Sequence, residues 1–170
     1  AELRNMAVGT AANGDPEFYL GGFQNPVLVT QSDPLVAKFD KDGNLLWSKI
    51  YTLSGDDEVS GIRMLSDGNL LLLGDTDENV GTDPFIGANN NGLIAKVNPA
   101  GDLLWAKAVP ARWGMRFRDA VEAPDGTLYA VGSNGDLVTD YYPSILVAKF
   151  SAEGELIHHV SIGEDPDWAD

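Results

Sequence analysis

The first group of residues whose types and spacing indicate chemistry is an acidic loop. Oxygen-bearing side chains recur at relative positions 1, 3, 5 and 9 of the segment 75–83, at Asp75, Asp77, Asn79 and Asp83. A short loop that wraps a hard cation in about six to eight oxygen ligands uses this kind of spacing. We therefore predict a Ca²⁺ site in this loop. The alternative is a solvated acidic loop in an acidic protein.

A second group combines positive charge with an indole ring. Arg112, Trp113, Arg116 and Arg118 lie close together, although the whole chain has only 11 basic residues. A guanidinium group binds carboxylates in a bidentate manner and stacks on aromatic rings. We predict that this segment contacts an acidic ligand or a partner. The alternative is a polar connector whose arginines pair with nearby carboxylates of the same chain.

Three lysines lie among apolar residues, which is an unusual setting for lysine. They are Lys38, Lys96 and Lys149, each preceded by alanine and an aliphatic residue. A catalytic lysine would not be needed three times. We interpret these residues as structural, with each stem packed along a strand and each ammonium paired to a carboxylate. We expect the partners to be residues such as Asp56, Asp57 or Glu58.

Two tryptophans, Trp47 and Trp105, occupy the same place after Lys38 and Lys96. We predict that they pack between repeats, and a sugar-stacking role is the alternative. The only histidines, His158 and His159, are neighbours whose side chains would point to opposite faces of a strand, so they cannot jointly bind one metal ion. No nucleophile motif is present, and we assign no catalytic residue.

These residues belong to a sequence repeat. The segments Leu35–Trp47, Leu93–Trp105 and Leu146–His158 are three copies of one pattern. The lysines give the period, because 96 − 38 = 58 and 149 − 96 = 53 residues. Such periods indicate units that bury their apolar faces only by stacking on neighbours.

Each repeat resolves into four short strands with two glycine-containing turns. In the middle copy, the turn Ser66–Gly68 precedes the apolar run Asn69–Gly74, which is too short for a typical helix and suits a strand buried on both faces. Four antiparallel strands per unit describe a β-propeller blade. We predict an all-β chain with blades at about 1–55, 56–111 and 112–165, and the start of a further blade at 166–170.

Three blades do not close a ring, because known propellers have about 4 to 8 blades. A three-blade arc leaves an apolar face exposed at each end, and a large exposed apolar patch marks an interface or a liability. We therefore expect a partial propeller that is completed by further chain or by oligomerisation, for example as six blades from two copies.

The pattern A-K-F-[D/S]-x-x-G-x-L-x-W, followed by G-D-D-E, S-D-G and L-x-x-x-G, resembles the SBBP-type bacterial propeller repeats, named for a seven-bladed β-propeller. The middle repeat, Asp56–Trp105, carries the full pattern, whereas the third has His158 in place of tryptophan. The resemblance implies a secreted, periplasmic or cell-surface scaffold without a shared catalytic set. More distantly, the blades are similar to quinoprotein and sialidase blades. The 75–83 loop is similar to the calcium loops of integrin-type propellers.

Composition narrows the possible partners. The net charge of −15 argues against binding nucleic acid, and no stretch approaches the ~20 apolar residues of a membrane span. The chain has no cysteine, which excludes disulfides and thiolate metal sites. We expect a non-catalytic scaffold or protein-interaction module with no cofactor other than Ca²⁺. The alternatives are a calcium-dependent, carbohydrate-binding propeller that takes a glycan partner, or part of a propeller enzyme.

Overall fold

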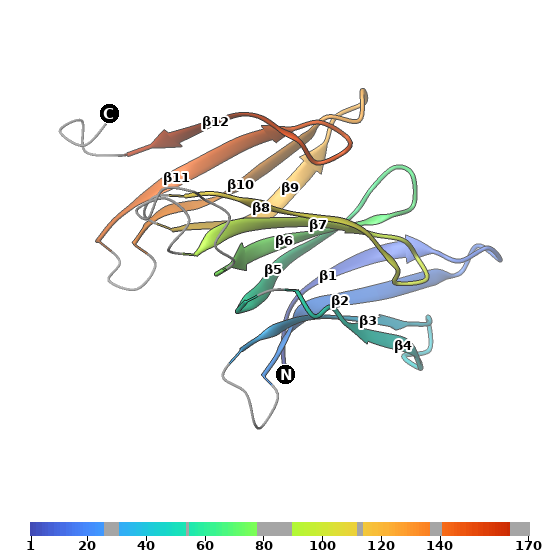
Figure 1. Ribbon diagram of the computed structural model, residues 1–170. Coiled ribbons are helices and arrows are strands. Elements are labelled where there is room, and N and C mark those ends of the chain that lie inside the picture. Colours follow the sequence, from blue (N-terminus) through green and yellow to red (C-terminus); the bar gives the residue numbers. More distant parts are fainter. Residues whose placement is uncertain (26–30, 54, 78–89, 112–113, 137–140, 164–170) are drawn as a thin grey trace.

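The computed structural model describes residues 1–25, 31–53, 55–77, 90–111, 114–136 and 141–163, and these form three antiparallel sheets of four strands each (Figure 1). Strand order within every sheet follows the sequence. The strands are β1 (Glu2–Thr10), β2 (Pro16–Gln24), β3 (Asp33–Phe39), β4 (Leu45–Ile50), β5 (Asp57–Met64), β6 (Leu70–Thr76), β7 (Asn91–Val97), β8 (Leu103–Val109), β9 (Met115–Glu122), β10 (Leu128–Asp136), β11 (Tyr141–Phe150) and β12 (Leu156–Ile162).

The all-β prediction is confirmed, and each sheet falls within one predicted repeat range. We call the sheets blade one (β1–β4), blade two (β5–β8) and blade three (β9–β12). Residues 166–170, where we expect a further blade to begin, lie outside the described part of the chain. In that described part, no helix is long and apolar enough to cross a membrane.

Glycine at the predicted turns provides the backbone conformation that closes each hairpin. Gly43, Gly101 and Gly154 connect the third and fourth strands of their blades with φ of +82°, +82° and +81°. This left-handed region costs residues with a Cβ about 1–2 kcal/mol. Recurrence of glycine at the same turn therefore keeps the outermost hairpin of all three blades in the same geometry.

A second set of glycines marks a bulge in the first strand of each blade. A Cβ at Gly74 would lie 1.8 Å from the carbonyl oxygen of Glu58, and Gly22 and Gly132 meet the first strands of their own blades in the same way. The register shifts at this point in all three blades. Only glycine lets the bulged strand approach this closely.

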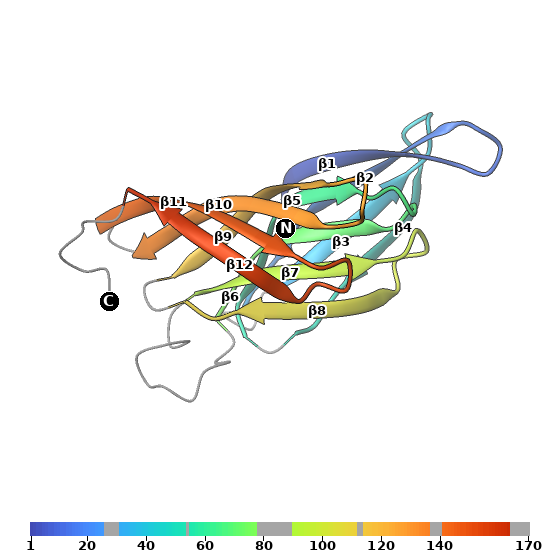
Figure 2. The ribbon, with the colours of Figure 1, turned by 90° about the horizontal axis from the view of Figure 1, so that it is seen from above.

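The blades stack in sequence order, with blade two between blades one and three (Figures 1 and 2). The first strands β1, β5 and β9 contact one another in turn, so they form the inner side of the arc. Two apolar cores fill the two junctions, and β6 contributes to both because alternate leucines point to opposite faces. Leu70 and Leu72 face blade one, whereas Leu71 and Leu73 face blade three.

We call the side of a blade that faces the preceding blade its entry face and the other side its exit face. In the described part of the chain, no blade lies against the entry face of blade one or the exit face of blade three. The fold therefore has the two uncovered ends expected of a partial propeller.

Candidate functional site

The junction between blades one and two is closed at its outer side by two alternate residues of β4 and by Tyr51, which directly follows β4. The ring of Trp47 covers Gly101, where an added Cβ would come within 2.9 Å of the indole. Two residues further on, Lys49 Nζ lies 2.8 Å from Asp102 Oδ1. Tyr51 Oη then donates a hydrogen bond of 2.9 Å to the carbonyl oxygen of Gly101.

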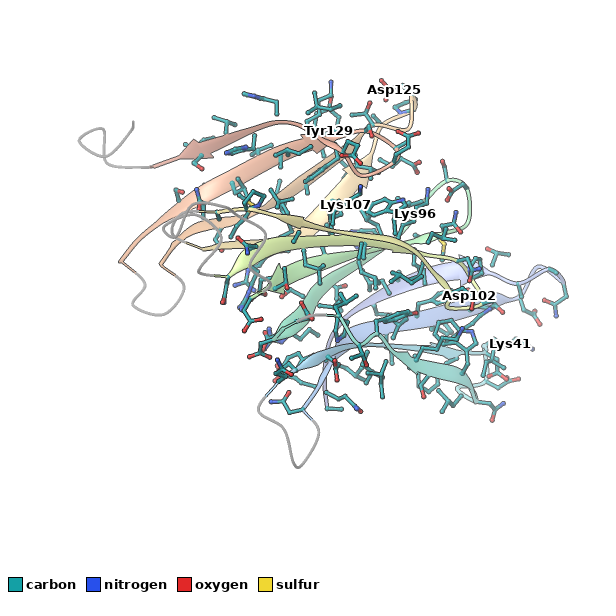
Figure 3. The ribbon with its side chains drawn as sticks, viewed as in Figure 1. Lys41, Lys96, Asp102, Lys107, Asp125 and Tyr129 are labelled. Carbon is teal, nitrogen blue, oxygen red and sulfur yellow. The ribbon has the colours of Figure 1, made fainter. Side chains whose placement is uncertain are left out.

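The same arrangement recurs between blades two and three. The Trp105 ring covers Gly154, and Lys107 Nζ lies 2.6 Å from Glu155 Oε1. Figure 3 labels Asp102, the acid of the first junction, and Lys107, the lysine of the second, which both belong to blade two. We call it the rim latch: an indole on a glycine and an ammonium on a carboxylate, both crossing from one blade to the next. The predicted packing of both tryptophans between repeats is observed.

Electrostatic environment differs between the two polar contacts of the first latch. A hydrogen bond from Lys49 is the largest influence on Asp102 and lowers the pKa of its exposed carboxyl group. Burial raises the pKa of the Tyr51 phenol to about 12, and the charge of Asp102 adds to this effect. The phenol therefore stays protonated and remains a hydrogen-bond donor well above neutral pH.

The repeated lysines pair within their own blades. Lys38 Nζ lies 2.8 Å from Glu17 Oε2, and Lys96 Nζ lies 2.7 Å from Asp67 Oδ2. Burial lowers the pKa of Lys38, but hydrogen bonds to Glu17 and Tyr19 outweigh it and the net pKa is raised. Lys149 Nζ lies 5.5 Å from the centre of the Tyr129 ring. Each of these pairs and contacts ties β3, β7 or β11 to the neighbouring hairpin of the same blade.

These pairings differ from the ones we expected for the lysines. Glu58 instead accepts a hydrogen bond of 2.9 Å from Arg4, and Asp56 accepts one from the Ser32 amide. Each of these two lysines pairs with an acid at or beside the turn between the first and second strands of its own blade, and not with the acidic segment 56–58. Lys38 and Lys96 thus each pair with a carboxylate, as expected, but the carboxylates that we named are not their partners.

A polar cavity of about 100 Å³ lies between blade two and β9, and three of the predicted site residues, Asp75, Asp77 and Arg116, line it. Its lining residues come from blade two, the segments beside it and β9, and all are polar or charged: Asp56, Glu58, Asp75, Asp77, Asn90 and Arg116. Four carboxylates and one guanidinium give the lining a formal charge of −4 + 1 = −3. Such a cavity favours a cationic or hydrogen-bond-donating group.

Asp75 and Arg116, which we assigned to two separate sites, form one bidentate pair in this cavity. Arg116 Nε and Nη2 lie 2.5 and 2.8 Å from the two oxygens of Asp75. Asp75 is almost completely buried, and Asn90 Nδ2 donates a further hydrogen bond to it at 3.3 Å. Burial lowers the pKa of Arg116, but Asp75 and Glu58 outweigh it, and the net pKa is raised. The charged pair connects blades two and three.

Of the other predicted site residues, Asp77 lines the same cavity but is not part of the ion pair. Asp77 accepts a hydrogen bond of 2.5 Å from the Asp56 amide, and Arg118 is exposed. Asn79, Asp83, Arg112 and Trp113 lie outside the described residues. Within the described ranges, no three acidic or histidine side chains are arranged to hold a metal ion. Calcium binding by the complete 75–83 loop stays a prediction.

Sequence reasoning missed the two latch lysines and the ion pair of the inner strands. Lys49 and Lys107 differ by 107 − 49 = 58 residues, which is the period of the repeat, so this signal was present in the sequence. Arg63 and Asp119 form a bidentate pair between β5 and β9, and Arg63 is the largest influence that lowers the pKa of Asp119. The first junction has Ala7 and Gly61 at these two positions, so the repeat gave no hint of the pair.

No family model and no curated protein matches the chain. Among solved structures, it is similar to a mutant of the Synechocystis apocarotenoid oxygenase, with a TM-score of 0.54 and 13% identity over 95% of this chain. It is also similar to an ACO/RPE65 chimera, with a TM-score of 0.53 and 12% identity over 94% of the chain. The apocarotenoid oxygenase is a β-propeller protein, so these similarities support a propeller fold.

The chain covers 38% of the length of each of these two solved proteins. It therefore corresponds to an arc of a propeller and not to a complete ring. At 12–13% identity the likeness concerns the fold alone. The resemblance to SBBP-type repeats stays a prediction.

Proposed function

We propose that this chain is a non-catalytic propeller segment that serves as a scaffold and interaction module. Its two end faces bind further blades, and we expect the assembly to be secreted or associated with the cell envelope. The observation that carries the proposal is the exposure of apolar side chains at positions that are buried wherever two blades meet.

The entry face of blade one shows this pattern. Leu3, Met6 and Val8 are about half exposed, at 49%, 51% and 52%. Strand pairing aligns Leu3 and Met6 with Val59 and Ile62 of blade two, both of which are 0% exposed. The same apolar positions are therefore covered when a preceding blade is present and uncovered when it is not.

The exit face of blade three shows it as well. Tyr129 and Val131 are 37% and 42% exposed, whereas the aligned Leu71 and Leu73 of blade two are completely buried. Covering apolar surface stabilises an assembly by roughly 25 cal/mol per Å² of surface removed from water. Both ends of the arc thus offer surface whose burial favours the addition of a blade.

A charge on each end face tests the proposal in the 170-residue chain. We expect the double variant Met6→Lys/Val131→Lys to bind the dye ANS several-fold less than the parent at a concentration where light scattering shows only monomers. Its unfolding midpoint should stay close to that of the parent, because exposed substitutions usually change stability by less than about 0.5 kcal/mol.

The control is Leu104→Lys, at an apolar residue that is half exposed on β8 of the middle blade and outside both end faces. We expect it to reduce dye binding less than the double variant. Equal dye binding by the parent and the double variant would contradict the proposal. A large loss of stability in the double variant would also contradict it, because that result would place these side chains in an internal core.

A further inference from the structure

The rim latch changes at the exit face of blade three. In the alignment of the repeats, His158, Val160 and Ile162 of β12 occupy the positions of Trp105, Lys107 and Val109 of β8. Val160 and Ile162 are about half exposed, and no blade among the described residues covers them. The outermost strand therefore keeps a ring at the first latch position but carries no ammonium at the second.

The latch also changes at the entry face of blade one. Asn44 occupies the position of the two latch acids Asp102 and Glu155, and it follows Gly43, which has the φ of Gly101 and no neighbouring atom within 4 Å of an added Cβ. Asn44 Nδ2 donates a hydrogen bond of 2.8 Å to Asp40 Oδ2. We call the glycine that an indole covers in each latch the glycine seat. At Gly43 this seat is uncovered, and the carboxylate beside it is replaced by the Asn44 amide.

These two changes match each other. A blade with a latch lysine placed on blade one would set its ammonium against the Asn44 amide, and a blade with a latch acid placed on blade three would set a carboxylate against Val160. The two open ends placed on each other leave neither charge unpaired. Electrostatic complementarity of this kind selects partners, because an unpaired charge at an interface carries a desolvation cost.

The inner strands β1, β5 and β9 show the same loss of charge at the two open ends. At the junction of blades two and three, Arg63 pairs with Asp119. Strand pairing aligns Arg63 with Val121 of blade three, and aligns Asp119 with Asn5 of blade one. The two members of this ion pair are therefore replaced by uncharged residues, Val121 on the exit face of blade three and Asn5 on the entry face of blade one. When the two open ends meet, neither of these positions brings in a charge that needs a partner.

We propose that the exit face of blade three binds the entry face of blade one of a second copy of this chain. His158 then lies on Gly43, Val160 lies against Asn44, and Tyr129 and Val131 bury the side chains of Met6 and Val8. Two copies joined in this way use the same interface twice and give 2 × 3 = 6 blades, within the roughly 4 to 8 of known propellers. This inference rests on the proposed function, since it names the blade that covers each end.

Restoring the missing latch tests the inference directly. We expect the parent chain to show a concentration-dependent molar mass that reaches 2 × 18.2 = 36.4 kDa in sedimentation equilibrium. The double variant Asn44→Asp/Val160→Lys creates one ion pair at each of the two interfaces and should tighten the dimer about 2- to 30-fold. The double variant Asn44→Lys/Val160→Lys sets like charges against each other and should weaken it by a similar factor.

The matched control is Thr52→Asp/Leu104→Lys, which introduces the same two charges at exposed positions of the middle of the arc. It should leave the dimer constant unchanged, and circular dichroism should show that all variants keep their strands. A parent that stays at 18.2 kDa at every concentration overturns the inference. So does a dimer constant that responds to neither latch variant. Loss of ANS binding in Met6→Lys/Val131→Lys would still support the proposed function in both cases.

Discussion

The two junctions between blades are alike at the rim and different inside. Both use an indole on a glycine and an ammonium on a carboxylate, at Trp47–Gly101 and Trp105–Gly154 for the ring contact. On the inner side, the first junction has Ala7 and Gly61 where the second has Arg63 and Asp119. The rim latch therefore sets how the blades stack, whereas the contacts of the inner strands distinguish one junction from the other.

The inner side of the second junction is the more ionic of the two. It contains the Arg63–Asp119 pair, the buried Asp75–Arg116 pair and a hydrogen bond of 2.6 Å from the Ser66 amide to Glu122. The first junction has the Arg4–Glu58 pair at 2.9 Å. Since a buried ion pair is costly to break and an exposed one contributes little, the two junctions should respond differently to loss of charge.

The largest expected effect is at the buried pair of the second junction. Asp75→Asn leaves the largely buried guanidinium of Arg116 with its main counter-ion removed, and removal of one partner of a buried pair costs about 3–5 kcal/mol. We expect a loss of that order in the free energy of unfolding, measured by urea denaturation. Asp102→Asn, which removes a largely exposed carboxylate from the first latch, should cost about 1 kcal/mol or less.

The double variant Asp75→Leu/Arg116→Met sharpens this comparison. Replacing both members of a buried pair by apolar residues of similar size is often neutral. We expect the double variant to be more stable than Asp75→Asn alone. If instead the single variant behaves like Asp102→Asn, the buried pair does not hold the second junction together.

The next largest effect should come from the glycine seats of the latch. Gly101→Ala adds a methyl group within 2.9 Å of Trp47 and Lys49, and Gly154→Ala adds one within 2.6 Å of Trp105. The positive φ alone costs about 1–2 kcal/mol, and forcing the indole away adds about 1–3 kcal/mol. Because the rim is alike at both junctions, we expect similar losses of stability in thermal unfolding of the two variants.

Gly68→Ala is the matched control for the glycine seats. Its φ of +81° is the same, but no atom lies within 4 Å of the added methyl group. It should therefore show the cost of φ alone. A loss as large as that of Gly101→Ala would mean that the indole does not press on the seat.

The architecture and the tryptophan contacts of the rim latch were predicted from the sequence, whereas the latch lysines were missed although they recur with the same period. Both of these predictions depend on positions that recur with the repeat, such as Trp47 and Trp105, and recurrence separates a structural role from chance. The partners of Lys38 and Lys96 were harder to find, because a lysine stem can reach several acidic residues and only the hairpin geometry selects Glu17 and Asp67.

The polar cavity could not be predicted from the sequence. Asp75 and Arg116 are 41 residues apart and belong to different blades. Neither residue recurs in the other repeats, so no spacing in the sequence relates them. The start of β11 also lies outside the repeat pattern, because the third copy of the pattern begins at Leu146 whereas β11 begins at Tyr141. This stretch pairs with β10 alone, since pairing with β12 begins at Ile145, and proline is tolerated at such an edge.

The smallest expected effect concerns a contact of the first junction that the second one lacks. Tyr51→Phe removes the hydrogen bond to the Gly101 carbonyl group, whereas the second junction has Val109 at this position. Loss of one buried hydrogen bond costs about 1 kcal/mol. Tyr129→Phe, on the exit face of blade three, should change stability less, and equal losses in the two variants would contradict a role for the Tyr51 hydroxyl group.

The pH dependence of the same contact gives a second measurement. Folding raises the pKa of Tyr51 from 10.0 to about 12, so the folded state retains a proton that the unfolded state loses. Its contribution to stability is complete below pH 10 and is lost as the pH rises through 12. Tyr51→Phe cannot show this loss, so the difference in unfolding free energy between the parent and the variant should shrink between these pH values. A difference that stays constant would mean that the phenol is not buried at the junction.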